Sequence, residues 1–262
     1  MEQNLKDQKE KYLKRGIYLL PNLFTVGSLF AGFYGIVAAL KGIYDVAAIS
    51  IFIAMIMDSL DGRVARMTHT TTAFGAEFDS ITDMVSFGLA PALIIYSWAL
   101  SNLGKFGWLA AFIYAVATAL RLARFNVQLG KGGKRYFQGL PCPSAAAVIV
   151  GLVWFGMDLG IDPHKFSIIF ALLTILMGIL MVSNIRYRSF KDIDFKKHVP
   201  FFVILIVVLI VVLVSIDPSK VLFTCFLVFA LSGPIGTILG LRKRKKERLA
   251  RQTTRSKLRE VK

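Results

Sequence analysis

The chain has 262 residues, of which 55% are hydrophobic and 18% are charged, and its mean hydropathy is +0.61. This composition excludes an ordinary water-soluble enzyme and indicates a single polytopic membrane domain. The net charge of +16 does not indicate nucleic-acid binding, because the aromatic residues lie in apolar runs rather than among the basic residues.

Apolar runs predict about eight membrane-spanning helices, since a span requires about 20 apolar residues. We expect them at 18–40, 43–67, 78–100, 106–125, 144–155, 166–182, 199–214 and 221–241, of which the fifth is the shortest. The predicted fold class is therefore all-α, a polytopic membrane helical bundle. Residues 1–17 are expected to form an amphipathic segment at the membrane surface, residues 18–241 the transmembrane domain, and residues 242–262 a basic tail.

The distribution of positive charge predicts the orientation of these spans. With the N-terminus in the cytoplasm, 28 of the 32 Lys and Arg residues fall on cytoplasmic segments and 4 on the other side. Cytoplasmic loops of membrane proteins carry such an excess of positive charge. We therefore expect an integral protein of a prokaryotic-type inner membrane with both termini in the cytoplasm.

A charged segment joins the second and third predicted spans. Two sets of residues in it each lie along one helix face: Asp58, Asp61, Gly62 and Ala65, and then Gly75, Asp79, Asp83 and Ser86. The intervening turn is short, so the two helices are predicted to be antiparallel neighbours with four aspartates facing each other. Glu77 falls off the second face and is not expected in the site.

Four carboxylates this close would repel each other unless cations neutralise them. Oxygen ligands without His or Cys favour Mg²⁺ or Mn²⁺, or Ca²⁺, over zinc. Two divalent ions would suit phosphoryl chemistry, in which they stabilise the attacking and leaving oxygens. The alternative, that the aspartates only mark a helix boundary, is disfavoured because carboxylates at membrane depth are costly.

The pattern Asp58-x2-Asp61-Gly62-x2-Ala65-Arg66-x8-Gly75-x3-Asp79-x3-Asp83 resembles the complete signature of the CDP-alcohol phosphotransferase family. Every fixed position and both long spacings agree. The flanking phrases SFGLAPA, RLARFN, FQGLPCPSAAA and VSNIRYRSFK resemble the membrane-integral members whose acceptor is serine. The resemblance implies a helical membrane enzyme, with the fold of that family, in which the hydroxyl of L-serine displaces CMP from CDP-diacylglycerol.

The resemblance also implies roles for individual residues. The four aspartates would hold two divalent cations, Mg²⁺ or Mn²⁺, and Asp83 would also act as the general base. The residues expected to border CDP-diacylglycerol are Gly62, Ala65, Arg66, Asn22 and Thr25. A helix-start role is an alternative for Asn22 and Thr25. A homodimer is implied by the family alone.

Serine brings a carboxylate, so its pocket should contain an arginine that phosphate does not already occupy. The candidates for this serine pocket are Arg121, Arg124, Asn126, Ser86, Arg186 and Arg188. For each arginine, a role as a positively charged membrane anchor is an alternative.

Two other functions remain open from the sequence. One is a member of the same family with a phosphorylated acceptor, either a phosphatidylglycerophosphate synthase or a phosphatidylinositol-phosphate synthase. The other is a divalent-cation transporter, although a transporter should carry polar residues along a path at midplane depth.

Overall fold

The computed structural model describes residues 2–68, 70, 72–129, 137–187 and 201–237 of the chain. Helices dominate the described part, and its regular elements in chain order are α1 (Glu2–Leu40), α2 (Tyr44–Met67), α3 (Ala73–Asp83), η1 (Met84–Leu89), α4 (Ala90–Ile95), η2 (Tyr96–Leu100), η3 (Ser101–Leu103), α5 (Lys105–Leu129), β1 (Phe137–Gln138), α6 (Cys142–Asp158), η4 (Pro163–Phe166), α7 (Ser167–Val182), β2 (Arg186–Tyr187) and α8 (Phe201–Ile216). A further helix spans Pro218–Thr237.

Five of the described helical segments are long and apolar enough to cross a membrane, which indicates an integral membrane protein. They are Pro21–Leu40, Ala73–Leu103, Lys105–Val127, Pro163–Val182 and Pro218–Thr237. Each of the eight predicted spans overlaps described helical residues, but α2, α6 and α8 do not meet both conditions of length and composition. Residues 199, 200 and 238–241 of the predicted spans lie outside the described part. The predicted all-helical class is confirmed, with one short strand pair that the sequence pattern did not reveal.

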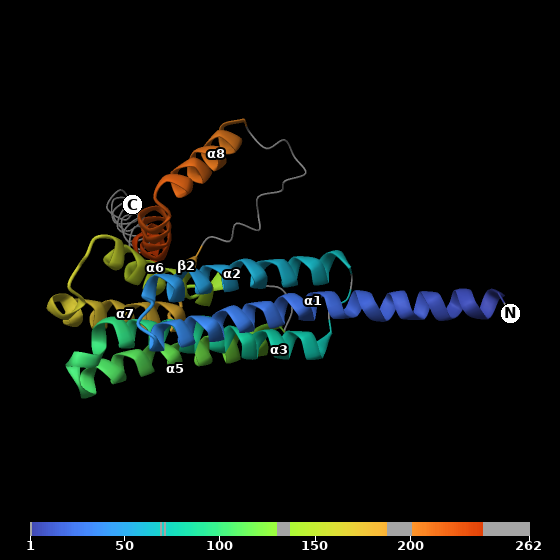
Figure 1. Ribbon diagram of the computed structural model, residues 1–262, viewed down its shortest axis with the longest axis horizontal. Helices are drawn as coiled ribbons and strands as arrows, with labels where there is room; N and C mark the ends of the chain where they lie inside the picture. The colour runs from blue at the N-terminus through green and yellow to red at the C-terminus, as the bar shows by residue number, and fades with distance from the viewer. Residues whose placement is uncertain (1, 69, 71, 130–136, 188–200, 238–262) are drawn as a thin grey trace, which may run out of the picture.

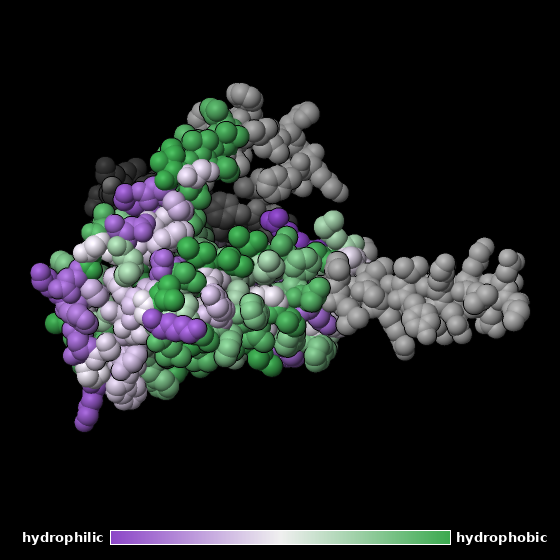
Figure 2. All heavy atoms as spheres, viewed as in Figure 1, coloured by the Kyte–Doolittle hydropathy of each residue, from purple (hydrophilic) through white to green (hydrophobic). Residues whose placement is uncertain are grey.

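Hydrophobic side chains cover much of the visible flank of the bundle, and hydrophilic ones gather mainly over its left end (Figure 2). Large hydrophobic residues such as Phe30, Phe112 and Leu172 have 69%, 55% and 56% of their surface exposed. In water such exposure would be costly, so these faces are suited to contact with lipid.

Helix α1 runs from Glu2 to Leu40 without interruption and projects beyond the other helices at its N-terminal end (Figure 1). The predicted boundary after residue 17 therefore does not coincide with a helix end. The predicted basic tail, residues 242–262, lies outside the described residues.

The helices pack around a core of small side chains, with α5 and α7 running in the same direction. α1 lies along α2, α5 lies along α7, and α2 also packs against α6. Close approach is possible because small residues such as Ala47, Ala48 and Ala54 are fully buried between the helices. At Gly32, an added Cβ would lie 2.5 Å from the hydroxyl oxygen of Ser86, so α1 can approach η1 only with glycine at this position.

The third predicted span is not a regular α-helix, and its irregular part begins directly after Asp83. Thr72 caps it by accepting a hydrogen bond from the Gly75 N–H at 3.0 Å, so the span begins at Ala73 rather than at residue 78. Wide π-helical turns occupy η1 and η2. Such turns often occur at functional sites in helices.

Pro91 has no N–H and cannot donate to the carbonyl of Phe87, four residues earlier. The hydroxyl of Tyr114, on α5, donates to that carbonyl at 2.9 Å instead. Both side chains are fully buried, so this bond replaces a backbone partner at a depth where water cannot.

The chain segments beside α6 and α7 meet in one hydrogen-bonded corner. β1 pairs with β2 in antiparallel register, with Gln138 opposite Arg186. The N–H of Gly139 donates to the Ile185 carbonyl at 2.9 Å, and the N–H of Leu140 donates to the Leu180 carbonyl at 3.0 Å. Gly139 has φ +83°, and a Cβ there would lie 2.1 Å from the Met181 carbonyl oxygen, so only glycine fits.

We predict that Tyr114→Phe lowers the stability of the bundle, because the buried Phe87 carbonyl loses its donor. An unsatisfied buried polar group costs about 1–3 kcal/mol. The thermal unfolding midpoint of the detergent-solubilised protein measures this loss. Tyr34→Phe is the matched control, since Tyr34 is 48% exposed on α1. Equal midpoints for the two variants would contradict the assigned role of the Tyr114 hydroxyl.

Candidate active site

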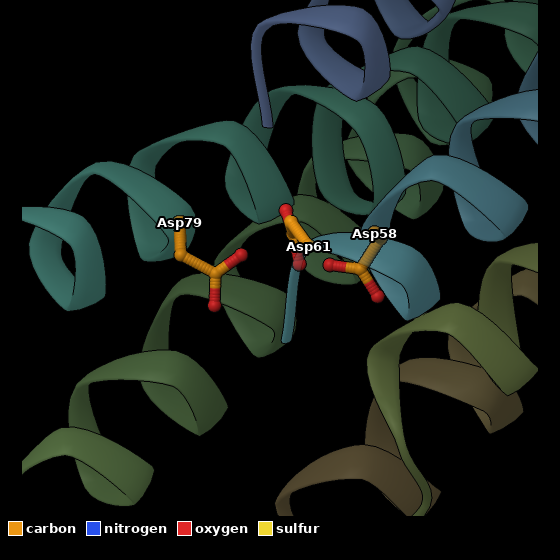
Figure 3. A group of neighbouring side chains, drawn as sticks. All are labelled: Asp58, Asp61 and Asp79. Atoms are coloured by element: carbon orange, nitrogen blue, oxygen red, sulfur yellow. The ribbon is translucent and has the colours of Figure 1, made fainter. Parts of the chain in front are cut away.

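Three aspartates from two helices converge at one point of the bundle. Asp58 and Asp61 lie on the C-terminal half of α2, and Asp79 lies on α3. Each offers a carboxylate oxygen, and these oxygens all lie within 4.8 Å of one another. Figure 3 shows Asp58 and Asp79 approaching Asp61 from opposite sides. Asp61 is the most deeply placed, with only 6% of its surface exposed.

Asp83 extends this cluster by one helical turn. Its carboxyl group interacts electrostatically with those of Asp58 and Asp79. The two helices that carry the acids were predicted to be direct neighbours, but α2 and α3 make few contacts with each other and both pack against α1. Glu77, two residues before Asp79, is exposed on another face of α3.

The arrangement of the four carboxylates fits a cation-binding role. Within the described part of the chain, no Lys or Arg side chain forms an ion pair with any of them. One buried carboxylate oxygen of Asp79 and one of Asp83 have no hydrogen-bond donor among the described residues. Buried negative charge without a partner is costly, and oxygen-only ligands suit Mg²⁺ or Mn²⁺. Asp58, Asp61 and Asp79 could therefore hold a metal ion.

Helix α1 contributes two of the sequence-predicted residues to the edge of this cluster. The hydroxyl of Thr25 lies 2.9 Å from Oδ2 of Asp61 and donates a hydrogen bond to it. Asn22 lies one turn earlier, and its amide oxygen would be 3.6 Å from a Cβ placed on Gly75. Both side chains face the paired helices rather than lipid.

The remaining residues predicted to border the liponucleotide lie on the last turns of α2. Arg66 is exposed, and its guanidinium would be 3.6 Å from a Cβ placed on Gly62. It interacts electrostatically with Asp61. Ala65 is partly buried, and its carbonyl accepts a hydrogen bond from the Thr70 N–H at 3.0 Å. The Arg66 guanidinium is the one described group near a Cβ placed on Gly62, so space remains on this side of the acids.

Arg121, on α5, also interacts with the acidic cluster. Its Nη1 donates to the sulfur of Cys142 at 3.0 Å, and its charge interacts with Asp83. Its Nε is buried and has no acceptor among the described residues. Cys142 is fully buried and helps to hold this guanidinium.

Two other candidates for the serine pocket make contacts that join helices. Arg124 donates to the Val182 carbonyl at 3.2 Å and to the side-chain oxygen of Asn184, at the C-terminal end of α7. Asn126 donates to the hydroxyl of Ser80 at 3.0 Å, directly beside Asp79. These bonds tie the end of α5 to α7 and to α3.

Of the other three candidates for the serine pocket, one is enclosed between helices and two have no described side chain. Ser86 is fully buried and donates to the Ser28 carbonyl at 3.1 Å, within the contact between η1 and α1. Arg186 lies in β2, where only its backbone is described, and Arg188 lies outside the described residues. Their proposed contacts with serine remain predictions.

Sequence reasoning missed several contacts that shape the site. Ser80, Cys142 and Asn184 were not assigned to it, although each binds a predicted residue. Cys142 lies in the phrase FQGLPCPSAAA and Asn184 in VSNIRYRSFK. The resemblance of these phrases to the family therefore pointed to the right segments but not to the contacts that the two residues make.

The amino-acid sequence matches a known protein family. The model of the CDP-alcohol phosphatidyltransferase family matches residues 18–182. A CDP-diacylglycerol–serine O-phosphatidyltransferase from Helicobacter pylori is 36% identical over 82% of this chain and 90% of its own length. One from Methanocaldococcus jannaschii is 38% identical over 72% of this chain and 83% of its own. An archaetidylserine synthase from Methanothermobacter thermautotrophicus is 36% identical over 64% of this chain and 69% of its own.

We predict that Mn²⁺ raises the thermal unfolding midpoint of the protein, because a ligand that binds only the folded state stabilises it. Asp58→Asn should remove most of this rise, since it takes a charged ligand from the cluster. Asp45→Asn is the matched control, because Asp45 is exposed in the first turn of the same helix. The cation site is refuted if Mn²⁺ stabilises the wild type and Asp58→Asn equally.

Proposed function

Since the chain belongs to the CDP-alcohol phosphatidyltransferase family, we propose that it transfers the phosphatidyl group of CDP-diacylglycerol to the hydroxyl of L-serine. The products are phosphatidylserine and CMP. The observation that carries the proposal is the convergence of Asp58, Asp61 and Asp79 from two helices, with Asp83 one turn further along α3. The choice of serine as acceptor is supported by the names of the relatives, which match most of the chain.

The aspartates provide the ligands that this chemistry requires. Asp58, Asp61, Asp79 and Asp83 would hold two divalent cations, Mg²⁺ or Mn²⁺. Such ions supply charge neutralisation for the pyrophosphate and for the departing CMP. The protein itself contributes position, because the two helices that carry the ligands are both packed against α1.

Asp83 is the proposed general base. It is the last residue of α3, at the point where the regular helix gives way to η1. Its carboxylate takes the proton of the serine hydroxyl as that oxygen attacks the phosphorus on the lipid side, and the bond from that phosphorus to the CMP oxygen breaks. The unpartnered oxygen of Asp83 supports this role, because no described donor competes for it.

Arg121 is the proposed partner of the serine carboxylate. Its charge interacts with Asp83, so a serine bound between them would place its hydroxyl toward the base and its carboxylate toward the guanidinium. The buried Nε supplies a donor that no described residue uses. Arg124 is less suited, because its donors bind the end of α7. The Arg121 bond to Cys142 fixes the guanidinium beforehand, which lowers the entropic cost of binding.

The two chemical halves of CDP-diacylglycerol are proposed to bind in different surroundings. Its acyl chains would lie in the bilayer, and its nucleotide would lie beside Gly62, Ala65 and Arg66 at the ends of α2 and α3. The excess of positive charge on one side of the bundle supports a cytoplasmic active site with both termini on that side. A homodimer is proposed from family membership alone.

The proposal is tested with purified protein, CDP-diacylglycerol, Mn²⁺ and labelled serine, with the product identified by mass. Phosphatidylserine and CMP should form in equal amounts, and EDTA should stop the reaction until Mn²⁺ or Mg²⁺ is restored. Parallel reactions with glycerol 3-phosphate and inositol phosphate test the other acceptors. Faster turnover with either one would overturn the assignment to serine.

We predict that Asp83→Asn lowers turnover about 100-fold or more, the range typical of losing a general base. CDP-diacylglycerol should still bind to this variant, since the other aspartates remain. Glu77→Gln on the same helix is the matched control, because Glu77 is exposed on another face. Near-normal turnover of Asp83→Asn would show that the base lies elsewhere.

We predict that Arg121→Ala raises the KM for serine roughly 10-fold, since a hydrogen bond to a charged group contributes about 1.5–3 kcal/mol. The KM for CDP-diacylglycerol should change much less. Arg63→Ala, at an exposed position of α2, is the control for the general effect of removing a positive charge. If both KM values rise equally in Arg121→Ala, Arg121 serves phosphate or folding instead.

A further inference from the structure

The bond between Thr25 and Asp61 joins helix α1 to the acidic cluster. Thr25 has 4% and Asp61 has 6% of its surface exposed, so solvent does not compete for this contact. The hydroxyl of Thr25 lies 2.9 Å from Oδ2 of Asp61. Among the four aspartates, Asp61 is the one that receives a side-chain hydrogen bond from a described hydroxyl group.

The Thr25 hydroxyl has two acceptors within reach and one hydrogen to donate. The second acceptor is the carbonyl of Pro21 on its own helix, at 3.2 Å. A hydrogen bond to a carboxylate is shorter and roughly twice as strong as one to a neutral carbonyl. The distances agree with this order, so the hydrogen points toward Asp61.

A single hydrogen bond at Oδ2 occupies only one of the lone-pair sites of the Asp61 carboxylate. Each carboxylate offers about four lone-pair sites on its two oxygens. The bond therefore fixes the rotation of the Asp61 side chain and leaves oxygen sites for a cation shared with Asp58 and Asp79, whose oxygens lie within 4.8 Å. Hydrogen bonds of this kind orient metal ligands in many proteins.

We propose that Thr25 is a positioning residue for the cation site, acting through Asp61 rather than through contact with the nucleotide. This inference rests on the proposed ion-binding role of the aspartates. It assigns to α1 a function in the chemistry although α1 supplies none of the four carboxylates. Removing the hydroxyl frees the Asp61 side chain to rotate, so cation binding weakens while the four ligands remain present.

The test is direct Mn²⁺ binding to the detergent-solubilised full chain, measured from the electron paramagnetic resonance signal of free Mn²⁺. Thr25→Val preserves the branched shape and removes the hydroxyl, and it should weaken Mn²⁺ binding by about 10-fold or more. Thr25→Ser retains a hydroxyl and should restore binding to within a few-fold of wild type. Turnover measured against Mn²⁺ concentration should shift in parallel, with an unchanged KM for serine at saturating Mn²⁺.

Thr174→Val is the matched control. Thr174 is fully buried on α7, and its hydroxyl donates at 2.8 Å to the Phe170 carbonyl one turn earlier. This variant loses the same atoms at the same depth and should bind Mn²⁺ as the wild type does. A similar loss in Thr174→Val would show a general effect on folding and overturn the inference.

The remaining outcomes separate the two proposals. If the wild type binds no Mn²⁺, the cation site itself fails, and the role of Thr25 fails with it. If the wild type binds Mn²⁺ and Thr25→Val binds it equally well, only the positioning role is overturned. If Thr25→Ser is as weak as Thr25→Val, the hydroxyl does not carry the effect, which also overturns the inference.

Discussion

Electrostatic repulsion among four carboxylates in a largely apolar bundle is the constraint on which the rest of the site depends. Asp58, Asp61, Asp79 and Asp83 lie on α2 and α3, which both pack against α1, and no described basic residue forms an ion pair with them. Such a cluster is unfavourable by itself and becomes favourable when cations bind. The stability of this part of the fold and the chemistry proposed for it therefore depend on the same charges.

The surrounding contacts all restrict the helices that carry these charges. Thr25 holds Asp61 from α1, and Asn126 holds Ser80 next to Asp79 from α5. Tyr114 replaces the backbone donor that Pro91 lacks, just after Asp83. Each bond involves a side chain that is buried or partly buried, where water is a poor substitute. The helices around the site thus have little freedom to move the acids apart.

The sequence predicted the helical class and the position of most helices because apolar runs report directly on membrane burial. It also predicted which faces carry the acids, since i, i+3 and i+4 spacing is a local property of α2 and α3. The third span was predicted to begin at residue 78, but the Thr72 cap extends it to Ala73. Capping and the π-helical turns at Met84 and Tyr96 depend on single polar contacts that an apolar run does not reveal.

Contacts between distant segments were beyond the sequence pattern. The Arg121–Cys142 bond and the pairing of β1 with β2 link residues that are far apart in the chain, and no periodicity connects them. Sequence reasoning treated six residues as equal candidates for the serine pocket. The fold distinguishes them, because Arg121 keeps a donor near Asp83, whereas Ser86 is enclosed between helices.

The corner at β2 has a mechanical consequence. Tyr187 donates from its hydroxyl to the Ala230 carbonyl at 2.9 Å, and a Cβ on Gly233 would lie 2.4 Å from its ring. The helix Pro218–Thr237 is thus bonded to β2. After β1, which pairs with β2, the chain passes through Leu140 to Cys142, whose sulfur accepts a hydrogen bond from Arg121. Residues 187 and 230 lie beyond the stretch that the family shares, 18–182. The surroundings of Arg121 therefore depend in part on a region outside the shared stretch, where the sequence can change without altering the signature aspartates.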